Sequence, residues 1–455
     1  MLIRMAGECA ALIDVARHST AGQAALPPPL RRQYPQAVIP ALRQDFNRRF
    51  RPEAYRSMLH GVDAVARAHV AFPIAETPCF FPKALLDEMA QIGADLTQRL
   101  IDDPEYLARS LAAIPEAWRA ADQDAHPHFL TADFGLVREF DGRLAPRLIE
   151  MQAFPSVFGF QWVVSEAYRS AFDLAPSLRF LLSGLDESSY WKLLRQVIVA
   201  GHDPDTVVLT DVEPAAQKTL PDFKITADRL GIHIVDIADL APEDRPDAGS
   251  ARPTSRLCFR EGRRRVPIRR IYNRAIVDEL IAKQIRLQFD YRESFDVEWA
   301  GHPNWYFHVS KFALPWLDHP AVPPAVFLSE WLNPRRSGAV RDRLPDDRDR
   351  WILKPLYSFA GQGIVFAPTD EQLAAIPPAQ RGHYLLQERL SFEPVIDTPE
   401  GPTQAEIRIL YAWPDHGRLT PVIGLVRLGR GKMMGVDHNK GQRWVGASAA
   451  FFDPK

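Results

Sequence analysis

A lysine placed just before a small, glycine-containing turn is the first group in this sequence that could do chemistry. Lys354 lies in an apolar, strand-like run that starts at Trp351, and a second apolar run starts at Ile364. Glycines let backbone N–H groups turn toward an anion, and the lysine adds a point charge at the strand end. The pattern predicts a polyphosphate-binding loop, with an ordinary hairpin as an equally common alternative. The turn residues expected to contact the anion are Ser358, Gly361, Gln362 and Gly363.

An acidic hairpin could supply the Mg²⁺ that accompanies a bound polyphosphate, because this ion takes hard oxygen ligands from one or two carboxylates. Asp133 precedes a predicted strand over Phe134–Phe140, while Glu150 and Gln152 lie on a second strand that starts at Arg147. Residues two apart on a strand point to the same face, so Glu150 and Gln152 can both address one ion. The hairpin is a candidate metal site, although such a pattern taken alone is more often a solvated strand face.

Two acidic residues at the end of another apolar run could contact a substrate. Val207–Asp211 predicts a strand, and Asp211 and Glu213 lie at its carboxyl end. Ligands of open α/β sheets bind beyond the carboxyl ends of the strands, and carboxylates there would suit a cationic or amine substrate. Capping of the following helix is the commoner role of such residues.

The elements that must position these residues divide into a helical part and several strand-rich parts. Apolar residues recur at three- and four-residue spacing from Leu85 to Leu100, which is typical of the helices expected over about 40–125. A second short strand at Ile232–Val235 completes a βαβ unit, and Ala275–Leu287 predicts a further helix. The charged run Arg335–Arg350 is expected to be a solvated connection. The remaining predicted strands are Arg269–Tyr272, Val326–Leu328, Tyr384–Gln387, Ile407–Tyr411 and Val422–Leu428.

Composition limits the class of protein. The 455 residues exceed what one hydrophobic core usually organises, so two or three domains with a cleft between them are expected. The formal net charge of −2 gives no reason to expect nucleic acid or an anionic membrane as partner. No apolar run is long enough for a membrane span, and no signal-type segment follows the first residues, so we expect a cytoplasmic protein.

Several common active-site patterns are missing from the sequence. The 13 histidines show no His-x-x-x-His spacing, which disfavours zinc. The 3 cysteines are too few and too scattered for a disulfide framework or a thiolate metal site. There is no Walker loop, no Gly-x-Ser-x-Gly elbow and no complete dinucleotide fingerprint.

Taken together, the acidic hairpin and the later lysine resemble one known family. Asp133-Phe134 is followed by Leu148-Ile149-Glu150-Met151-Gln152 and then by Pro155-Ser156. This order resembles the circularly permuted ATP-grasp enzymes, such as glutathionylspermidine synthase, in which the metal motif precedes the glycine loop. The resemblance runs loosely over residues 129–448. It implies an α/β (α+β) chain with an ATP-grasp fold in circularly permuted order, a Rossmann-like pre-ATP-grasp βαβ domain and a helical N-terminal region.

The resemblance also implies domain boundaries. They are residues 1–125, a mostly helical N-terminal region; 126–200, the metal-binding part of the ATP-grasp core; 201–325, the βαβ pre-ATP-grasp or substrate domain; and 326–455, the glycine-loop lid and nucleotide-binding lobe.

Roles for single residues follow from the same resemblance. It implies ATP and Mg²⁺ as cofactors, with the metal on Asp133, Glu150 and Gln152. The segment from Asn304 to Lys311 resembles the family's Asn-Lys segment, whose lysine faces the nucleotide phosphates. Further implied roles are phosphate binding by Lys311 and Lys354, an adenine hinge at Gln387 and Glu388, substrate binding by Asn304, and charge neutralisation by Arg408 and Arg427.

The implied activity is that of an ATP-dependent ligase. It would activate a small-molecule or peptide carboxylate as an acyl phosphate and join it to an amine or similar nucleophile. This chain departs from the family at two positions, with Gln152 where an Asn is usual and Thr131 where an arginine is often found. These departures favour an alternative, a catalytically inactive nucleotide-binding module with a regulatory or scaffold role. A small-molecule kinase is a second alternative, and trapping a hydroxamate would separate it from a ligase.

Overall fold

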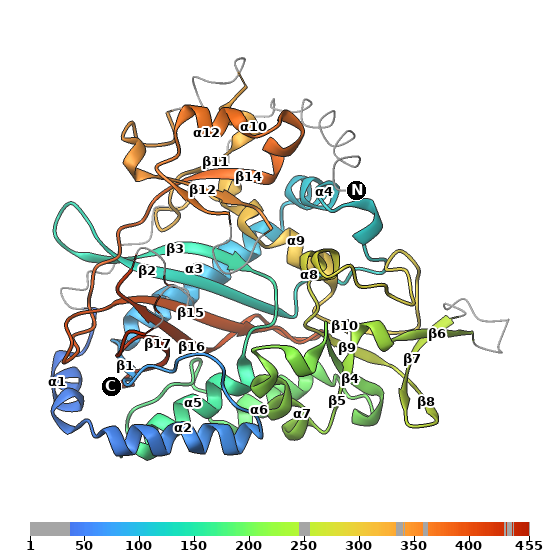
Figure 1. Cartoon of the computed structure of the whole chain (residues 1–455), viewed down its shortest axis with the longest axis horizontal. Coiled ribbons are helices and arrows are strands. Elements are labelled where there is room, and N and C mark those ends of the chain that lie inside the picture. The colour runs from blue at the N-terminus through green and yellow to red at the C-terminus, as the bar shows by residue number, and fades with distance from the viewer. Residues whose placement is uncertain are drawn as a thin grey trace.

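The chain folds into mixed helices and sheets, which confirms the predicted mixed α/β class (Figure 1). The computed structural model describes residues 37–244, 255–333, 340, 342–357, 363–431, 434, 439 and 441–454. Residues 1–36, the first part of the predicted helical region, lie outside this set. Within the described ranges, no helix is both long enough and apolar enough to cross a bilayer.

A six-stranded central sheet carries the acidic hairpin. Its strands lie in the order β1-β17-β16-β15-β2-β3, so segments from both ends of the chain are neighbours. All neighbouring pairs are antiparallel except β1 and β17. The bounds are β1 (Cys79–Phe80), β2 (Phe129–Arg138), β3 (Leu144–Gln152), β15 (Gln404–Ala412), β16 (Thr420–Gly429) and β17 (Gly446–Phe451).

The two faces of the central sheet bury different helices. Leu130, Ala132 and Tyr411 pack with α3 (Lys83–Ile101) in one hydrophobic core. The alternate residues Phe129 and Leu410 pack with α5 (Phe158–Ala171) in another. Because side chains alternate along a strand, Asp133 and Arg408 point to the α5 side, beyond the part of that face that the second core covers.

Close packing of α3 depends on one glycine. A Cβ at Gly93 would lie 2.2 Å from the Tyr411 hydroxyl oxygen, too short for any real contact. The missing side chain allows α3 to approach the sheet, and the Tyr411 hydroxyl donates to the carbonyl of Ala90 at 2.9 Å. The helix thereby closes the sheet face opposite Asp133.

The remaining helices surround the sheets. Their bounds are α1 (Pro40–Arg49), α2 (Pro52–Ala66), α4 (Pro104–Ala112), α6 (Glu187–Ile198), α7 (Leu220–Leu230), α8 (Val277–Ala282), α9 (Pro303–His308), α10 (Leu328–Trp331) and α12 (Asp370–Ala375). Short 3₁₀ turns are η2 (Glu116–Trp118), η3 (Pro204–Thr206), η4 (Pro214–Ala216), η5 (Ile237–Asp239), η6 (Lys311–Trp316), η7 (Arg348–Arg350) and η8 (Pro378–His383).

The predicted βαβ unit is present in a four-stranded parallel sheet of order β10-β9-β4-β5. Helix α7 connects β4 to β5 and ends at Gly231, which has a φ of 73° and caps the helix in the left-handed conformation. The strands are β4 (Val207–Asp211), β5 (His233–Asp236), β9 (Arg270–Asn273) and β10 (Glu298–Ala300). The helix predicted over Ala275–Leu287 is shorter than expected, because α8 ends at Ala282.

Two smaller sheets complete the described structure. The upper sheet, at the top of Figure 1, is antiparallel with order β11-β14-β12-β13. Its strands are β11 (Ala325–Phe327), β12 (Trp351–Pro355), β13 (Val365–Phe366) and β14 (Tyr384–Glu388). The other sheet contains β6 (Ala241–Asp244), β7 (Ser255–Glu261) and β8 (Arg264–Pro267).

The C-terminal part of the chain thus serves two sheets. Strands β11, β12, β13 and β14 form the upper sheet, whereas β15, β16 and β17 join the acidic hairpin in the central sheet. This sharing places the late arginines beside the early carboxylates. The proposed domain boundaries stay predictions.

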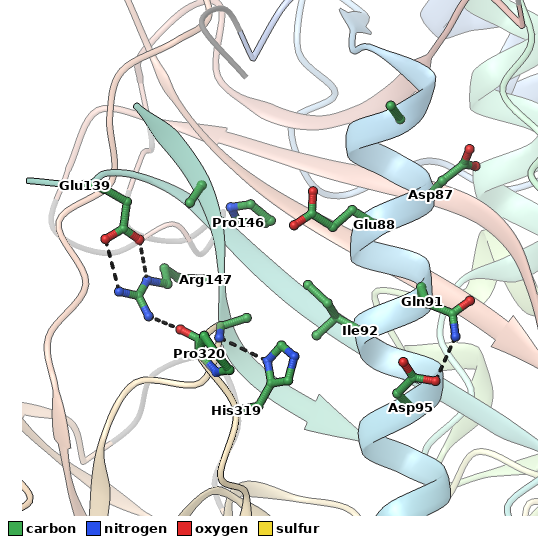
Figure 2. Close-up of a pocket in the computed structure, with 13 residues that line it drawn as sticks. Asp87, Glu88, Gln91, Ile92, Asp95, Glu139, Pro146, Arg147, His319 and Pro320 are labelled. Atoms are coloured by element: carbon green, nitrogen blue, oxygen red, sulfur yellow. Dashed lines mark hydrogen bonds and ion pairs between the residues drawn. The ribbon is translucent and has the colours of Figure 1, made fainter. Parts of the chain in front are cut away.

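A groove of about 410 Å³ runs along α3 (Figure 2). One stripe of α3, including Asp87, Glu88 and Asp95, forms one wall, and Arg147 and Pro320 contribute to the other. Arg147 binds Glu139 at 3.0 Å and donates to the carbonyl of Pro320. Because α3 covers the opposite face of the central sheet, this groove is separate from the candidate site described next.

Candidate functional site

Asp133 lies at the centre of a charged cluster on the central sheet. It is buried and directly opposite Arg408 in the register of β2 and β15. Its carboxylate accepts two hydrogen bonds from Arg408, at 2.6 and 2.5 Å, and one from Arg427 at 2.8 Å. Burial alone would raise the pKa of Asp133, but the two guanidinium groups outweigh it and lower the pKa below its ordinary value. Asp133 is therefore an ionised, fully paired carboxylate.

Glu150 and Gln152 lie on β3, next to Asp133. The register pairs Glu150 with Asp133 and Gln152 with Thr131. The Gln152 amide donates to Glu150 Oε1 at 2.8 Å, and Lys311 Nζ lies 3.7 Å from Glu150 Oε2. The Glu150 carboxylate therefore contacts one neutral amide and one more distant lysine. It is held less tightly than the Asp133 carboxylate, which binds two arginines.

A third carboxylate in the cluster, Glu406, was missed as a site residue by the sequence analysis. Glu406 lies two residues before Arg408 on β15, so both side chains point to the same face. Its carboxylate binds Arg427 at 2.7 Å. Burial raises the pKa of Glu406 to about 7, with Asp133 and Glu150 adding to the effect and Arg427 opposing it. The spacing of two between Glu406 and Arg408 was the available signal. We call Asp133, Glu150, Glu406, Arg408 and Arg427 the Asp133 cluster.

Lys354 approaches the Asp133 cluster from the upper sheet. It is buried on β12, on the face opposite the core that contains Leu353. Burial lowers the pKa of Lys354 to about 8; the fields of Glu150 and Glu406 raise it, and that of Lys311 lowers it. Lys354 forms no hydrogen bond or ion pair with the described residues. The acidic groups that influence its ammonium group, Glu150 and Glu406, belong to the central sheet. The structure therefore brings the early acidic hairpin and the late lysine together.

The donor set suits a magnesium ion bound through few protein ligands. Glu150, Gln152 and Glu406 offer two carboxylates and one amide oxygen, whereas Asp133 is occupied by two arginines. Among the described residues there is no group of three or more His, Cys, Asp or Glu side chains arranged to hold a metal. Mg²⁺ commonly binds one or two carboxylates and completes its shell with phosphate oxygens and water, so this sparse set fits.

Gln387 and Glu388 lie at the end of β14 in the upper sheet. Gln387 is buried, and its side-chain oxygen has no hydrogen-bond partner in the described structure. A buried polar atom without a partner is costly, which fits an acceptor that a ligand would satisfy. Glu388, in contrast, forms an ion pair with Arg350 at the end of the neighbouring turn.

The predicted glycine turn is described only in part. Ser358, Gly361 and Gln362 lie outside the described residues. Gly363 is described and has a φ of 73°, a left-handed conformation that favours glycine. A Cβ there would lie 2.8 Å from the Pro355 ring, so close packing also requires glycine at this position.

Asp211 lies at the carboxyl end of β4, where a substrate was expected. It is buried, and burial raises its pKa to about 7 even though Arg274 opposes the shift. Arg274 also donates to the backbone carbonyl of Ser156, whose hydroxyl lies 3.5 Å from Arg408. A continuous chain of neighbours therefore leads from Asp211 to the Asp133 cluster.

Two predicted substrate contacts are engaged elsewhere. Glu213 is exposed and binds Lys283 at 2.7 Å. The Asn304 amide is buried and bonds to the backbone of Ala120, at 2.9 and 3.0 Å, and to Gln123 at 2.9 Å. With its oxygen and nitrogen both satisfied inside the fold, Asn304 holds α9 to the loop before β2.

Comparison with known proteins gives a fold but no sequence family. No protein-family model matches the chain, and no curated protein sequence matches it significantly. Among the solved structures, 27 chains match. One is a glutathione synthetase-like effector from Globodera pallida in its apo form, with a TM-score of 0.50 and 13% sequence identity. The match covers 88% of this chain and 96% of that chain. The chain thus has a fold related to that of glutathione synthetase-like proteins, and identity this low shows the fold alone.

Proposed function

We propose that the chain is an ATP- and magnesium-dependent ligase of the ATP-grasp type, in circularly permuted order. It activates a carboxylate as an acyl phosphate and joins it to an amine or similar nucleophile. The observation that carries this proposal is the buried Lys354 of one sheet, which has no hydrogen bond or ion pair among the described residues and lies in the field of Glu150 and Glu406 of another sheet. The shared fold with a glutathione synthetase-like protein supports it.

The two lysines and the carboxylates have complementary roles in this proposal. Lys354 and Lys311 hold the phosphates, whose negative charge compensates the burial of the Lys354 ammonium group. Glu150, Gln152 and Glu406 hold the magnesium ion, which neutralises charge on the phosphates when bound. Gln387 accepts a hydrogen bond from the nucleotide base.

The arginines act on the reacting groups. Arg408 and Arg427 are fixed in place by Asp133, so they need no rearrangement to stabilise charge that develops during phosphoryl transfer. Asp133 then serves as the residue that positions these arginines, which revises its predicted role as a metal ligand. Asp133 and Glu406 are buried and the other members of the cluster are half-buried, which limits the access of water that would otherwise hydrolyse an acyl phosphate.

A coupled assay for ADP tests the proposal. The protein is incubated with Mg-ATP and a panel of amino acids and short peptides, together with amines, and ADP is measured for each pair. The ligase is supported by ADP release that requires both a carboxylate and a nucleophile, and by a hydroxamate when hydroxylamine replaces the amine. A stable phosphorylated product that is insensitive to hydroxylamine would indicate a kinase instead.

A second candidate is a nucleotide-binding module without turnover. Two observations favour it: Asp133 is fully neutralised by arginines, and the Gln152 amide nitrogen donates to Glu150. A protein of the same fold is described as an effector. This candidate predicts ATP binding, measured by calorimetry, with no ADP released from any pair in the panel.

A further inference from the structure

The hairpin formed by β7 and β8 carries a dense patch of arginines. Its tip lies at the right-hand edge of the molecule in Figure 1, away from the upper sheet. The apolar residues of the hairpin, such as Phe259 and Val266, point into a core and are buried. We call the four exposed arginines at the tip the arginine hairpin: Arg260, Arg263, Arg264 and Arg265.

The arginine hairpin contains a repulsive pair. In the register of β7 and β8, Arg260 lies directly opposite Arg265. Like charges at directly opposite positions destabilise an antiparallel pair. Glu243 lies 3.5 Å from Arg265 and so offsets one of the two charges, whereas Arg260 forms no ion pair with any described residue. An anion placed between the two guanidinium groups would relieve the remaining repulsion.

The same sheet already shows how a carboxylate is held. Glu243 of β6 accepts two hydrogen bonds from Arg256, at 3.0 and 2.7 Å, and lies 3.5 Å from Arg265. These arginines lower the pKa of Glu243, with hydrogen bonding by Arg256 as the main cause. Because Arg256, Arg260 and Arg265 share one face, a second carboxylate would extend this row toward the tip.

The surroundings of the tip select the kind of anion. All residues from Arg260 to Arg265 are exposed and none is aromatic or aliphatic, so the tip offers neither a platform for stacking bases nor a wedge for lipid. Residues 255–267 carry five arginines and one glutamate, which leaves −6 on the rest of a chain whose net charge is −2. A long polyanion would extend beyond the arginine hairpin and be repelled by the negative charge of the rest of the chain. A short acidic segment fits better, because planar guanidinium groups pair bidentately with carboxylates.

We propose that the arginine hairpin is a docking surface for an aspartate- and glutamate-rich segment of a partner protein. The segment places its carboxylates between Arg260 and Arg265 and against Arg263 at the turn, continuing the contact that Glu243 makes. This surface is independent of the proposed ligase activity.

Fluorescence anisotropy with a labelled octaglutamate peptide tests the proposal. The full chain is compared with a variant that carries Arg260→Glu and Arg265→Glu, the two arginines that lie opposite each other in the register. The matched control carries Lys192→Glu and Arg418→Glu, which change the charge equally at exposed positions outside the hairpin. The hairpin variant should bind the peptide at least about tenfold more weakly and the control within about twofold, and binding should weaken with salt.

Several outcomes would overturn the proposal. It fails if the wild-type chain does not bind the peptide, or if the control loses as much affinity as the hairpin variant. Phosphatidylserine vesicles and a 20-nucleotide DNA, single-stranded or duplex, are assayed in parallel. Tighter binding of either one through the same arginines would replace the acidic segment with that partner. Circular dichroism and thermal melting verify that both variants fold.

Discussion

Two clusters of charge in this molecule, each built around one buried side chain, differ in how well their members are paired. In the His128 network, which consists of Asp124, His128, Arg270, Glu298 and Asp415, every charge has a close partner. His128 binds Asp124 at 3.1 Å and Asp415 at 2.6 Å, and Arg270 bridges Asp415 at 2.9 Å and Glu298 at 2.7 Å. In the Asp133 cluster, by contrast, Glu150 is bound by a neutral amide at 2.8 Å and its cationic partner Lys311 is 3.7 Å away, while the neighbouring Lys354 has no partner among the described residues.

The difference separates a structural network from a candidate active site. This fully paired network links the central sheet to the parallel sheet. His128 precedes β2 and Asp415 follows β15, both strands of the central sheet, whereas Arg270 lies on β9 of the parallel sheet. Incomplete pairing costs stability and persists where a ligand supplies the missing charge. The comparison therefore predicts that substitutions in the His128 network affect folding, whereas those at Glu150 and Lys354 affect ligand binding and turnover.

The largest effect on stability is expected inside the Asp133 cluster itself. Asp133→Asn removes the buried carboxylate that both arginines share and leaves Arg427 with Glu406 alone, so the free energy of unfolding should fall by about 3–5 kcal/mol. Urea denaturation measures the change. Glu406→Gln is the control, because it removes one partner of Arg427 and leaves Asp133 in place. Equal stability of the Asp133 variant and the wild type would contradict the assignment of Asp133 as the counter-ion of both arginines.

Glu150→Gln should separate activity from stability. The substitution keeps the shape of the side chain and removes the charge that would bind magnesium, so ADP release should fall by about 100-fold or more. The melting temperature should stay close to that of the wild type, because the glutamine keeps an oxygen that can accept the 2.8 Å hydrogen bond from the Gln152 amide. Unchanged ADP release would remove Glu150 from the proposed metal site.

Lys354→Met should weaken ATP binding on the order of tenfold, since a phosphate-facing charge is lost.

The same substitution should change how stability depends on pH. The pKa of Lys354 is lowered to about 8, so the unfolded chain binds more protons between pH 8 and the ordinary lysine pKa. The wild type should therefore gain stability relative to the variant as pH rises through this window. Calorimetry with Mg-ATP and urea denaturation across the pH range measure the two effects. An unaltered affinity for ATP would indicate that β12 and the following turn form an ordinary hairpin.

The smallest effect is expected at His128. Burial alone would lower the pKa of His128, but Asp124 and Asp415 outweigh it and raise the pKa above the ordinary value. The stabilisation from the charged ring is thus present below about pH 6.5 and is lost as pH rises through the raised value. His128→Asn should cost about 1 kcal/mol at pH 5.5 and less at pH 8. A substitution cost that grows with pH would contradict the pairing, and ADP release serves as the control.

Local patterns in the sequence were enough for most of the elements near the site. The hairpin of β2 and β3, the βαβ unit and strands β14, β15 and β16 all follow from alternating or periodic apolar residues with turn signals between them. Element lengths were less predictable: α8 ends at Ala282, where the expected helix continued to Leu287. The periodic signal near a helix end is weak, so its boundary depends on tertiary contacts.

By itself, the sequence determined which residue types could bind a nucleotide and a metal, because carboxylates, lysines and glycines carry their chemistry wherever they lie. The tertiary structure alone decided that Asp133 pairs with Arg408 and Arg427. It also decided that Lys354 lies in the field of Glu150 and Glu406. These contacts join strands that are hundreds of residues apart in the chain, and a short-range pattern contains no information about which strands become neighbours. Whether a carboxylate is a ligand or a counter-ion depends on those neighbours.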